Sequence, residues 1–271
     1  MRLFRSHLRR LARRPATLVT YLLLTGLMLL VIVAVAAASQ EEADPQGAIA
    51  ARLILTFPAA WTLTLSMVVA IGGMLALTYG AAIAGAEWSW GTLKTAIARG
   101  EGRARYTLAA IAGATVIAWC GTLVAYATGV AGAFASAAVV HISSNTLIDA
   151  QTAGDLVGRL ARAALAIAMD VSIGYAIASV ARSQLAGIGA GIGLYFGEGI
   201  IGIFVPQIIK WAPFAATSAM LGGGSPGAAS AAGAASSARL DPDVAVVVVA
   251  AWLVVAVGFA ALWTERADIS G

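Results

Sequence analysis

The chain has 271 residues, of which 60% are hydrophobic and only 11% are charged, and its mean hydropathy is +0.88. Soluble domains are typically about 45–50% apolar and about 25% charged, and one water-soluble core of this size could not bury so much apolar surface. This excludes a soluble enzyme, a disordered protein and a free-standing nucleic-acid binder, despite the excess of 17 Lys and Arg over 13 Asp and Glu. The single cysteine, Cys120, excludes a disulfide framework and a thiolate metal site.

The apolar residues form long uncharged runs, each close to the roughly 20 residues that a helix needs to cross a bilayer core about 30 Å thick. These runs are continuous and do not alternate, which predicts helices and not barrel strands. We therefore expect an all-α polytopic membrane protein, with a single transmembrane domain over residues 1–271. The predicted transmembrane helices are residues 17–38, 58–83, 106–135, 160–181, 185–205 and 244–263.

The charges orient these helices. The third run, Tyr106 to Ile148, is long enough for two short helices, which would invert everything after it. With six spans and both termini in the cytoplasm, twelve of the 17 Lys and Arg residues lie inside, and acidic residues gather in the outer segments. Because loops rich in Lys and Arg stay in the cytoplasm, we expect the six-span arrangement.

Residues 1–14 precede the first span and are strongly basic. On a helix, the apolar side chains fall on one side and most arginines fall on the other; the apolar set is Leu3, Phe4, Leu8 and Leu11, and the basic set is Arg2, Arg5, Arg9 and Arg13. This pattern predicts an amphipathic helix on the inner membrane surface, where anionic headgroups contribute about 1 kcal/mol per nearby Arg. The arginines can also be read as a topology anchor alone, but the ordered apolar stripe favours contact with a partner.

The loop of residues 84–105 follows the second span and is the longest cytoplasmic connection. We expect a helix over residues 87–98, with Trp90, Leu93 and Ile97 on one face. Arg99 and Gly100 suit its end, since Arg favours the negative end of the helix dipole and Gly favours the cap. Such a helix is suited either to the membrane interface, as its tryptophans indicate, or to a soluble partner.

The residues of this loop carry a resemblance. They read Gly-x-Glu-x-x-x-Gly-Thr-Leu-Lys and then Arg-Gly-x-x-Arg, which here are Gly85, Glu87, Gly91, Thr92, Leu93, Lys94, Arg99, Gly100 and Arg103. The pattern resembles the cytoplasmic loop of type-2 ABC transporter permeases, over the whole chain in layout and over about residues 80–110 in motif. The resemblance implies a coupling helix that inserts into an ATPase subunit, with Glu87, Gly91, Thr92, Leu93, Lys94, Arg99 and Arg103 as the coupling residues.

The same resemblance implies the other parts of the transporter. Residues 1–14 are similar to the connecting helix beside the coupling loop, with Arg9, Arg10 and Arg13 as its candidate contacts. The chain has no Gly-x-x-x-x-Gly-Lys-Ser/Thr loop for phosphates, so ATP and Mg²⁺ are expected on a separate ATPase chain and no cofactor on this one. The family implies two ATPase copies and a second permease chain, as a homodimer or related heterodimer, in a bacterial-type cytoplasmic (inner) membrane.

Two acidic residues lie inside predicted spans: Asp170 in the fourth and Glu198 in the fifth. An ionisable group there costs about 2.5–3.5 kcal/mol on insertion scales, which makes a functional role the default hypothesis. Arg159 and Arg162 share the helix of Asp170 but lie roughly 16 Å and 12 Å along it. We therefore expect the partner of Asp170 on another helix or in water, either in a structural hydrogen-bond site or along a substrate pathway.

The fifth span is rich in glycine, and its pairs Gly189–Gly193 and Gly193–Gly197 favour close helix contact within the bundle or across a dimer. A flexible gate is the alternative.

Residues 206–243 form an outer loop that we expect to begin with a short re-entrant or interfacial helix. Its stretch Gly222 to Ser237 is of low complexity, and we expect no site there.

No catalytic or metal-binding constellation is visible, since His7 and His141 are the only histidines. We expect a non-catalytic permease subunit of an exporter for a hydrophobic or amphiphilic substrate, with lipids but no nucleic acid as partners. One alternative is an ion- or proton-coupled secondary transporter or channel that uses Asp170 and Glu198, although residues 1–135 and 136–271 show no internal repeat. Another is a non-transporting membrane anchor for a cytoplasmic ATPase.

Overall fold

The structure is a computed structural model, and it describes residues 2–41, 44–142, 147–222 and 239–267. The regular elements in these ranges are all α-helices, which confirms the predicted all-α class. They are α1 (Arg2–Ala12), α2 (Pro15–Ala38), α3 (Pro45–Leu55), α4 (Ala59–Ser89), α5 (Thr92–Ala98), α6 (Arg103–Val139), α7 (Ala150–Ala181), α8 (Gln184–Phe204), α9 (Pro206–Ile209), α10 (Pro213–Leu221) and α11 (Pro242–Arg266).

Six helices of the described ranges are long and apolar enough to cross a membrane, namely α2, α4, α6, α7, α8 and α11. They correspond to the six predicted spans, and their apolar character indicates a multi-pass membrane protein. The ends differ, because α4 continues to Ser89 and α7 already begins at Ala150. The third run forms one unbroken helix of 37 residues, so the alternative of two short helices is wrong.

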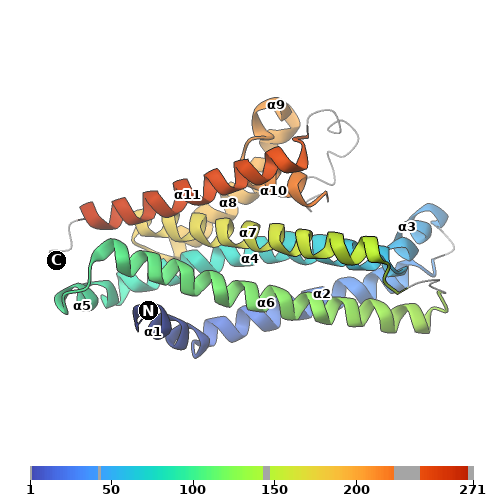
Figure 1. Ribbon diagram of the computed structural model, residues 1–271, viewed down its shortest axis with the longest axis horizontal. Helices are drawn as coiled ribbons and strands as arrows, with labels where there is room; N and C mark the ends of the chain where they lie inside the picture. Colours follow the sequence, from blue (N-terminus) through green and yellow to red (C-terminus); the bar gives the residue numbers. More distant parts are fainter. Residues whose placement is uncertain (1, 42–43, 143–146, 223–238, 268–271) are drawn as a thin grey trace.

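The long helices lie lengthwise beside one another, and α8 and α11 follow one flank of the bundle (Figure 1). Helices α1 and α5 and the C-terminal end of α11 lie at one end, called here the α1/α5 end. Helix α3 lies at the other end, and α9 and α10 flank the bundle between its middle and α3; this part of the bundle is called here the α3/α10 end. In the most apolar 18-residue stretch of each helix, 67% of the residues of α4 and 72% of those of α7 are buried. The corresponding share is 17% for both α2 and α8. Helices α4 and α7 therefore form the centre of the bundle, and α2 and α8 expose most of their surface.

Helices α4 and α7 approach so closely that their backbones touch. A Cβ atom added to Gly80 would overlap the carbonyl group of Val171, and one added to Gly174 would overlap the carbonyl group of Leu77. Small residues allow this approach, which gains dispersion contacts that larger side chains would prevent. The two glycines therefore fix the spacing of the central helix pair.

The glycines of α8 behave differently from the prediction. Gly187 and Gly191 face the bundle, where an added Cβ would overlap Ala178 and Leu77 respectively. An added Cβ at Gly189, Gly193 or Gly197 meets nothing within 4 Å. The predicted close contact through these three glycines is thus wrong within this chain, because they lie on the open face of α8.

Two short elements flank the spans at the α3/α10 end. The side chain of Asp44 accepts a hydrogen bond from the amide of Gly47 at 3.0 Å and, with Pro45 in the first turn, starts α3, which the sequence analysis did not predict. The predicted short helix after the fifth span is confirmed as α9 and α10. Most of the low-complexity stretch lies outside the described residues.

We expect Gly174→Ala to lower the free energy of unfolding by about 1–3 kcal/mol, because the methyl group would force the two backbones apart. Gly258→Ala is the matched control, since an added Cβ there meets nothing within 4 Å. The control is expected to be neutral or to stabilise the protein by up to roughly 1 kcal/mol. Thermal unfolding in detergent measures both changes, and equal melting temperatures for the two variants would contradict the close contact.

Candidate functional site

Glu87 lies in the last turn of α4, at the α1/α5 end, and its side chain is only 1% exposed. Its carboxylate accepts hydrogen bonds from three other helices. Arg10 of α1 donates at 2.7 Å, Tyr106 of α6 at 3.2 Å and Tyr175 of α7 at 2.7 Å. One buried charge thus holds four helices together.

His7 of α1 completes this group, which we call the Glu87 cluster (His7, Arg10, Glu87, Tyr106 and Tyr175). The Nδ1 atom of His7 lies 3.1 Å from the guanidinium of Arg10, and its ring meets that of Tyr106 edge-on at 4.6 Å. Burial, with smaller contributions from the charges of Arg10 and Arg14, lowers the pKa of His7 to about 4. The imidazole is therefore neutral near pH 7, and Nδ1 can accept a hydrogen bond from Arg10.

The loop after α4 is organised around Gly91. Its φ of +65° lies in the left-handed region, which glycine adopts without steric cost. The chain therefore turns at Trp90–Gly91, and the single helix predicted over residues 87–98 is wrong: α4 ends at Ser89 and α5 begins at Thr92. The predicted end at Arg99 and Gly100 is confirmed as the end of α5: Arg99 is the C-cap, and Gly100 follows with a φ of +86°.

The structure divides the other predicted coupling residues between an inward and an outward face of the loop. Leu93 is buried, and the hydroxyl of Thr92 donates to the backbone carbonyl of Glu87 at 3.4 Å. Lys94 on α5 and Arg99 directly after it are exposed. Arg103 points back, donating to the carbonyls of Glu265 and Ala267, both at 3.0 Å, where it caps the end of α11.

Two further cations fasten the end of α4 to its neighbours. The guanidinium of Arg14, just after α1, lies 5.4 Å from the ring centre of Trp90. That of Arg182, at the end of α7, lies 4.9 Å from the ring centre of Trp88. Such cation–π contacts each contribute about 0.5–1 kcal/mol at exposed sites. The turn between α4 and α5 is therefore fixed from two sides.

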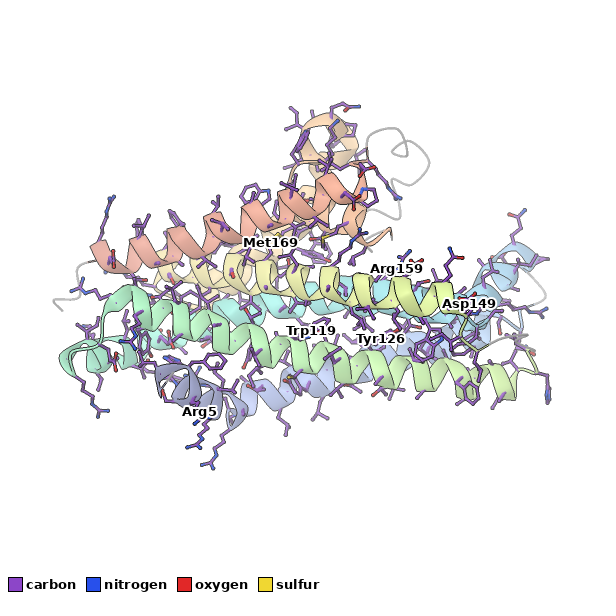
Figure 2. All side chains as sticks on the ribbon, viewed as in Figure 1. Arg5, Trp119, Tyr126, Asp149, Arg159 and Met169 are labelled. Atoms are coloured by element: carbon purple, nitrogen blue, oxygen red, sulfur yellow. The ribbon has the colours of Figure 1, made fainter. Side chains whose placement is uncertain are left out.

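The arginines of α1 have different surroundings. Arg10 belongs to the Glu87 cluster, while Arg5, Arg9 and Arg13 are exposed. Figure 2 shows Arg5 on the side of α1 that faces away from the bundle. His7 and Leu11 are buried on the opposite side. The helix thus presents a basic surface outward and packs its other face on the bundle.

Glu198 of α8 lies at the α3/α10 end and binds the first turn of α10. Its carboxylate accepts hydrogen bonds from the amides of Phe214, at 3.3 Å, and of Ala215. Arg159 and Arg162 of α7 donate to the carbonyls of Leu221 and Met220, at 3.0 Å and 3.4 Å, at the other end of α10. A carboxylate at the N-terminus and guanidinium groups at the C-terminus both complement the helix dipole.

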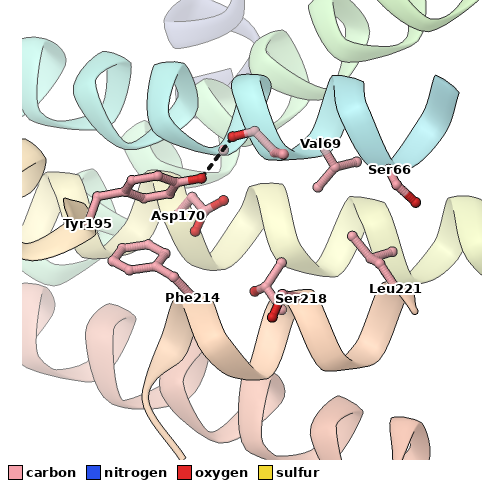
Figure 3. Close-up of a pocket in the computed structure, with 10 residues that line it drawn as sticks. Ser66, Val69, Asp170, Tyr195, Phe214, Ser218 and Leu221 are labelled. Carbon is pink, nitrogen blue, oxygen red and sulfur yellow. Dashed lines mark hydrogen bonds between the residues drawn. The ribbon is translucent and has the colours of Figure 1, made fainter. Parts of the chain in front are cut away.

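Asp170 of α7 is 2% exposed, and neither arginine of its own helix reaches it, as predicted. It borders a cavity of about 30 Å³ between α4, α7, α8 and α10. Figure 3 shows Asp170 beside Tyr195, between the side chains of α4 and those of α10. Of the two intramembrane acids, Glu198 therefore has a structural partner, and Asp170 faces a cavity.

Sequence reasoning did not find the roles of His7, Tyr106 and Tyr175. These residues lie far apart in the chain, and no spacing connects them to Glu87 before the helices are packed.

No group of three or more His, Cys, Asp or Glu residues among the described ones could hold a metal ion. No family model matches the chain, and no curated protein matches it.

We expect Glu87→Gln to lower the free energy of unfolding by about 3 kcal/mol, near the lower end for a broken buried ion pair, because the side chain of Arg10 is 35% exposed. Tyr175→Phe removes one hydrogen bond to a charged group and is expected to cost about 1.5–3 kcal/mol. Thermal unfolding of these variants and of a double-mutant cycle with Arg10→Ala measures the pair. Glu265→Gln, an exposed acid at the same end, is the control and is expected to stay within about 0.5 kcal/mol; a similar loss there would contradict the role of Glu87.

Stability is also expected to depend on pH through His7. Its folded pKa of about 4 lies below its ordinary value of 6.5, so the unfolded chain binds more protons between these values. Stability therefore falls as the pH drops from 6.5 to 4, by at most about 3 kcal/mol. His7→Asn keeps an acceptor but does not titrate, and its melting temperature should fall less over this range. Equal pH profiles for the two proteins would show that His7 is not buried in its neutral form.

Proposed function

We propose that this chain is the membrane-spanning permease subunit of an ABC exporter, in which a separate cytoplasmic ATPase drives the export of a hydrophobic or amphiphilic substrate. The single observation that carries the proposal is the placement of the loop motif. The middle of the motif lies in a short helix, α5, at one end of a six-span bundle, with Lys94 and the following Arg99 exposed and Leu93 buried. A partner that binds the exposed face would therefore push on a helix that is seated against the bundle.

The connection from α5 to the bundle supports transmission of such a push. Only Trp90 and Gly91 separate α5 from α4, which is one of the two central helices. The buried carboxylate of Glu87 ties that end of α4 to α1, α6 and α7. We therefore assign Glu87 to transmission within the chain and not to direct contact with the ATPase, which revises the role implied by the resemblance.

The basic face of α1 supports the same orientation. Arg5, Arg9 and Arg13 are exposed at the end of the bundle that carries α5. With this end in the cytoplasm, the arrangement follows the positive-inside rule and both termini are cytoplasmic. We infer that Arg9 and Arg13 face the ATPase or anionic headgroups, in the manner of a connecting helix on an inner membrane, while Arg10 holds α1 in place.

A second permease chain is part of the proposal. Gly189, Gly193 and Gly197 form an open face on α8, and α2 is also mostly exposed. Such surfaces suit close contact between helices in a membrane. The working unit would hold two permease chains, identical or related, and two ATPase subunits. ATP and Mg²⁺ would bind to the ATPase, and this chain would carry no catalysis.

Two alternatives to the exporter assign different roles to the acidic residues and to the α5 surface. A secondary transporter or channel would use Asp170 and Glu198, but Glu198 is hydrogen-bonded to the amides of α10, which favours a structural role for it. A non-transporting anchor would use the α5 surface to bind an ATPase but would have no pathway for a substrate. Only a transport measurement separates that anchor from the exporter.

The binding step is tested by purifying the full-length chain with the products of neighbouring reading frames and asking whether a P-loop ATPase accompanies it. We expect Arg99→Glu to weaken this association by roughly tenfold, about 1.4 kcal/mol, because it reverses a charge on the exposed face of α5. Arg239→Glu reverses an exposed charge at the opposite end and is the matched control. Its affinity should equal that of the unmodified protein.

The coupling step is tested by measuring ATPase activity and transport in proteoliposomes. We expect Tyr175→Phe to bind the ATPase normally but to lower the transport achieved per ATP, because it loosens the link between α4 and α7. Transport that persists on an ion gradient without ATP would overturn the proposal, as would the absence of any associated ATPase. An ATPase that associates without transport would favour the anchor.

A further inference from the structure

The cavity beside Asp170 is small, and its lining is mostly apolar. Its volume of about 30 Å³ leaves room for one or two water molecules or a small ion, and not for an amphiphilic substrate. Four residues that carry hydroxyl groups line it together with Asp170: Ser66 from α4, Tyr195 from α8, and Thr217 and Ser218 from α10. A few polar side chains thus interrupt the apolar wall of the cavity around Asp170 (Figure 3).

All four hydroxyl groups donate their protons elsewhere. Ser66 donates to the carbonyl of Thr62 at 3.0 Å, Thr217 to Pro213 at 3.0 Å, Ser218 to Ala215 at 2.8 Å and Tyr195 to Ala70 at 2.8 Å. Each hydroxyl has only one proton to give. These side chains therefore offer the cavity no hydrogen-bond donor, and their hydroxyl oxygens can only accept there.

Asp170 has no counter-charge in this setting. Among the described residues its Oδ1 atom is buried without a hydrogen-bond partner, and no Lys or Arg lines the cavity. Arg159 and Arg162 are bound to the end of α10, and Glu198 adds a second negative charge nearby. A bare carboxylate that is buried among acceptors would cost several kcal/mol.

We propose that Asp170 is a binding site for a small monovalent cation: a proton on the carboxyl group or a sodium ion among the carboxylate and hydroxyl oxygens. A proton taken from hydronium forms an O–H bond at Asp170 and leaves a water molecule behind. A sodium ion would take the carboxylate oxygens and hydroxyl oxygens of the lining as ligands. Either cation neutralises the carboxylate, and neither depends on whether the chain serves an ATPase.

Infrared difference spectra of the full-length protein in lipid nanodiscs test the site directly. The protein is titrated from acid to alkaline pH in NaCl and in choline chloride at equal ionic strength. We expect a carboxylic acid C=O band that shifts in D₂O, is absent from Asp170→Asn and persists in Glu198→Gln. Loss of the band when sodium replaces choline identifies sodium as a ligand, and a band that ignores sodium identifies the proton alone.

Thermal stability gives a second measurement. Asp170→Asn mimics the neutral site and should melt a few degrees above the unmodified protein at alkaline pH, with no dependence on sodium. Ser218→Ala removes one hydroxyl oxygen from the lining and should shift the titration, whereas Ser172→Ala, whose buried hydroxyl donates to Ala168 outside the cavity, should not. An Asp170 that stays ionised in both salts, with no band and no gain in stability from Asp170→Asn, overturns the proposal.

Discussion

A single buried carboxylate determines the arrangement of the α1/α5 end. Glu87 is almost completely removed from solvent, and a charge in such a place is tolerated only when donors surround it. The donors come from three helices, so α1, α6 and α7 must all reach the end of α4. The position of α5 follows from this, because its first residue comes only three residues after the end of α4 at Ser89. The exposed surface offered to a partner is therefore set by a contact inside the bundle.

The α3/α10 end applies the same electrostatic rule with a different result. Glu198 and the two arginines of α7 hold the two ends of α10, so each of these charges has a backbone partner. Asp170 lies close by without one. The two acids look alike in the sequence, as ionisable residues in apolar spans. Packing alone distinguishes them, because it brings the free amides of α10 to Glu198 and leaves Oδ1 of Asp170 without a donor beside a small cavity.

The parts of the fold that could be predicted are those that local sequence decides. Span number and approximate ends follow from the length of apolar runs, and the end of α5 follows from Arg99–Gly100. The break at Gly91 could not be separated from a continuous helix, because glycine permits a positive φ without requiring it. The hydroxyl donors to Glu87 could not be predicted either, since Tyr106 and Tyr175 reach it from other helices. Local patterns specify elements, and long-range packing specifies the site.

One stripe of α4 joins the two ends. Gly73, beside Asp170, is followed at intervals of seven residues by Gly80, which touches the backbone of α7, and by Glu87. Seven residues are close to two helical turns, so all three lie along one face over about 21 Å. The same face meets α7 throughout, and the backbone contacts at Gly80 and Gly174 leave no room for the two helices to slide. Helices α4 and α7 therefore form the closely packed centre through which the two ends are joined, and α2 and α8 lie at its surface.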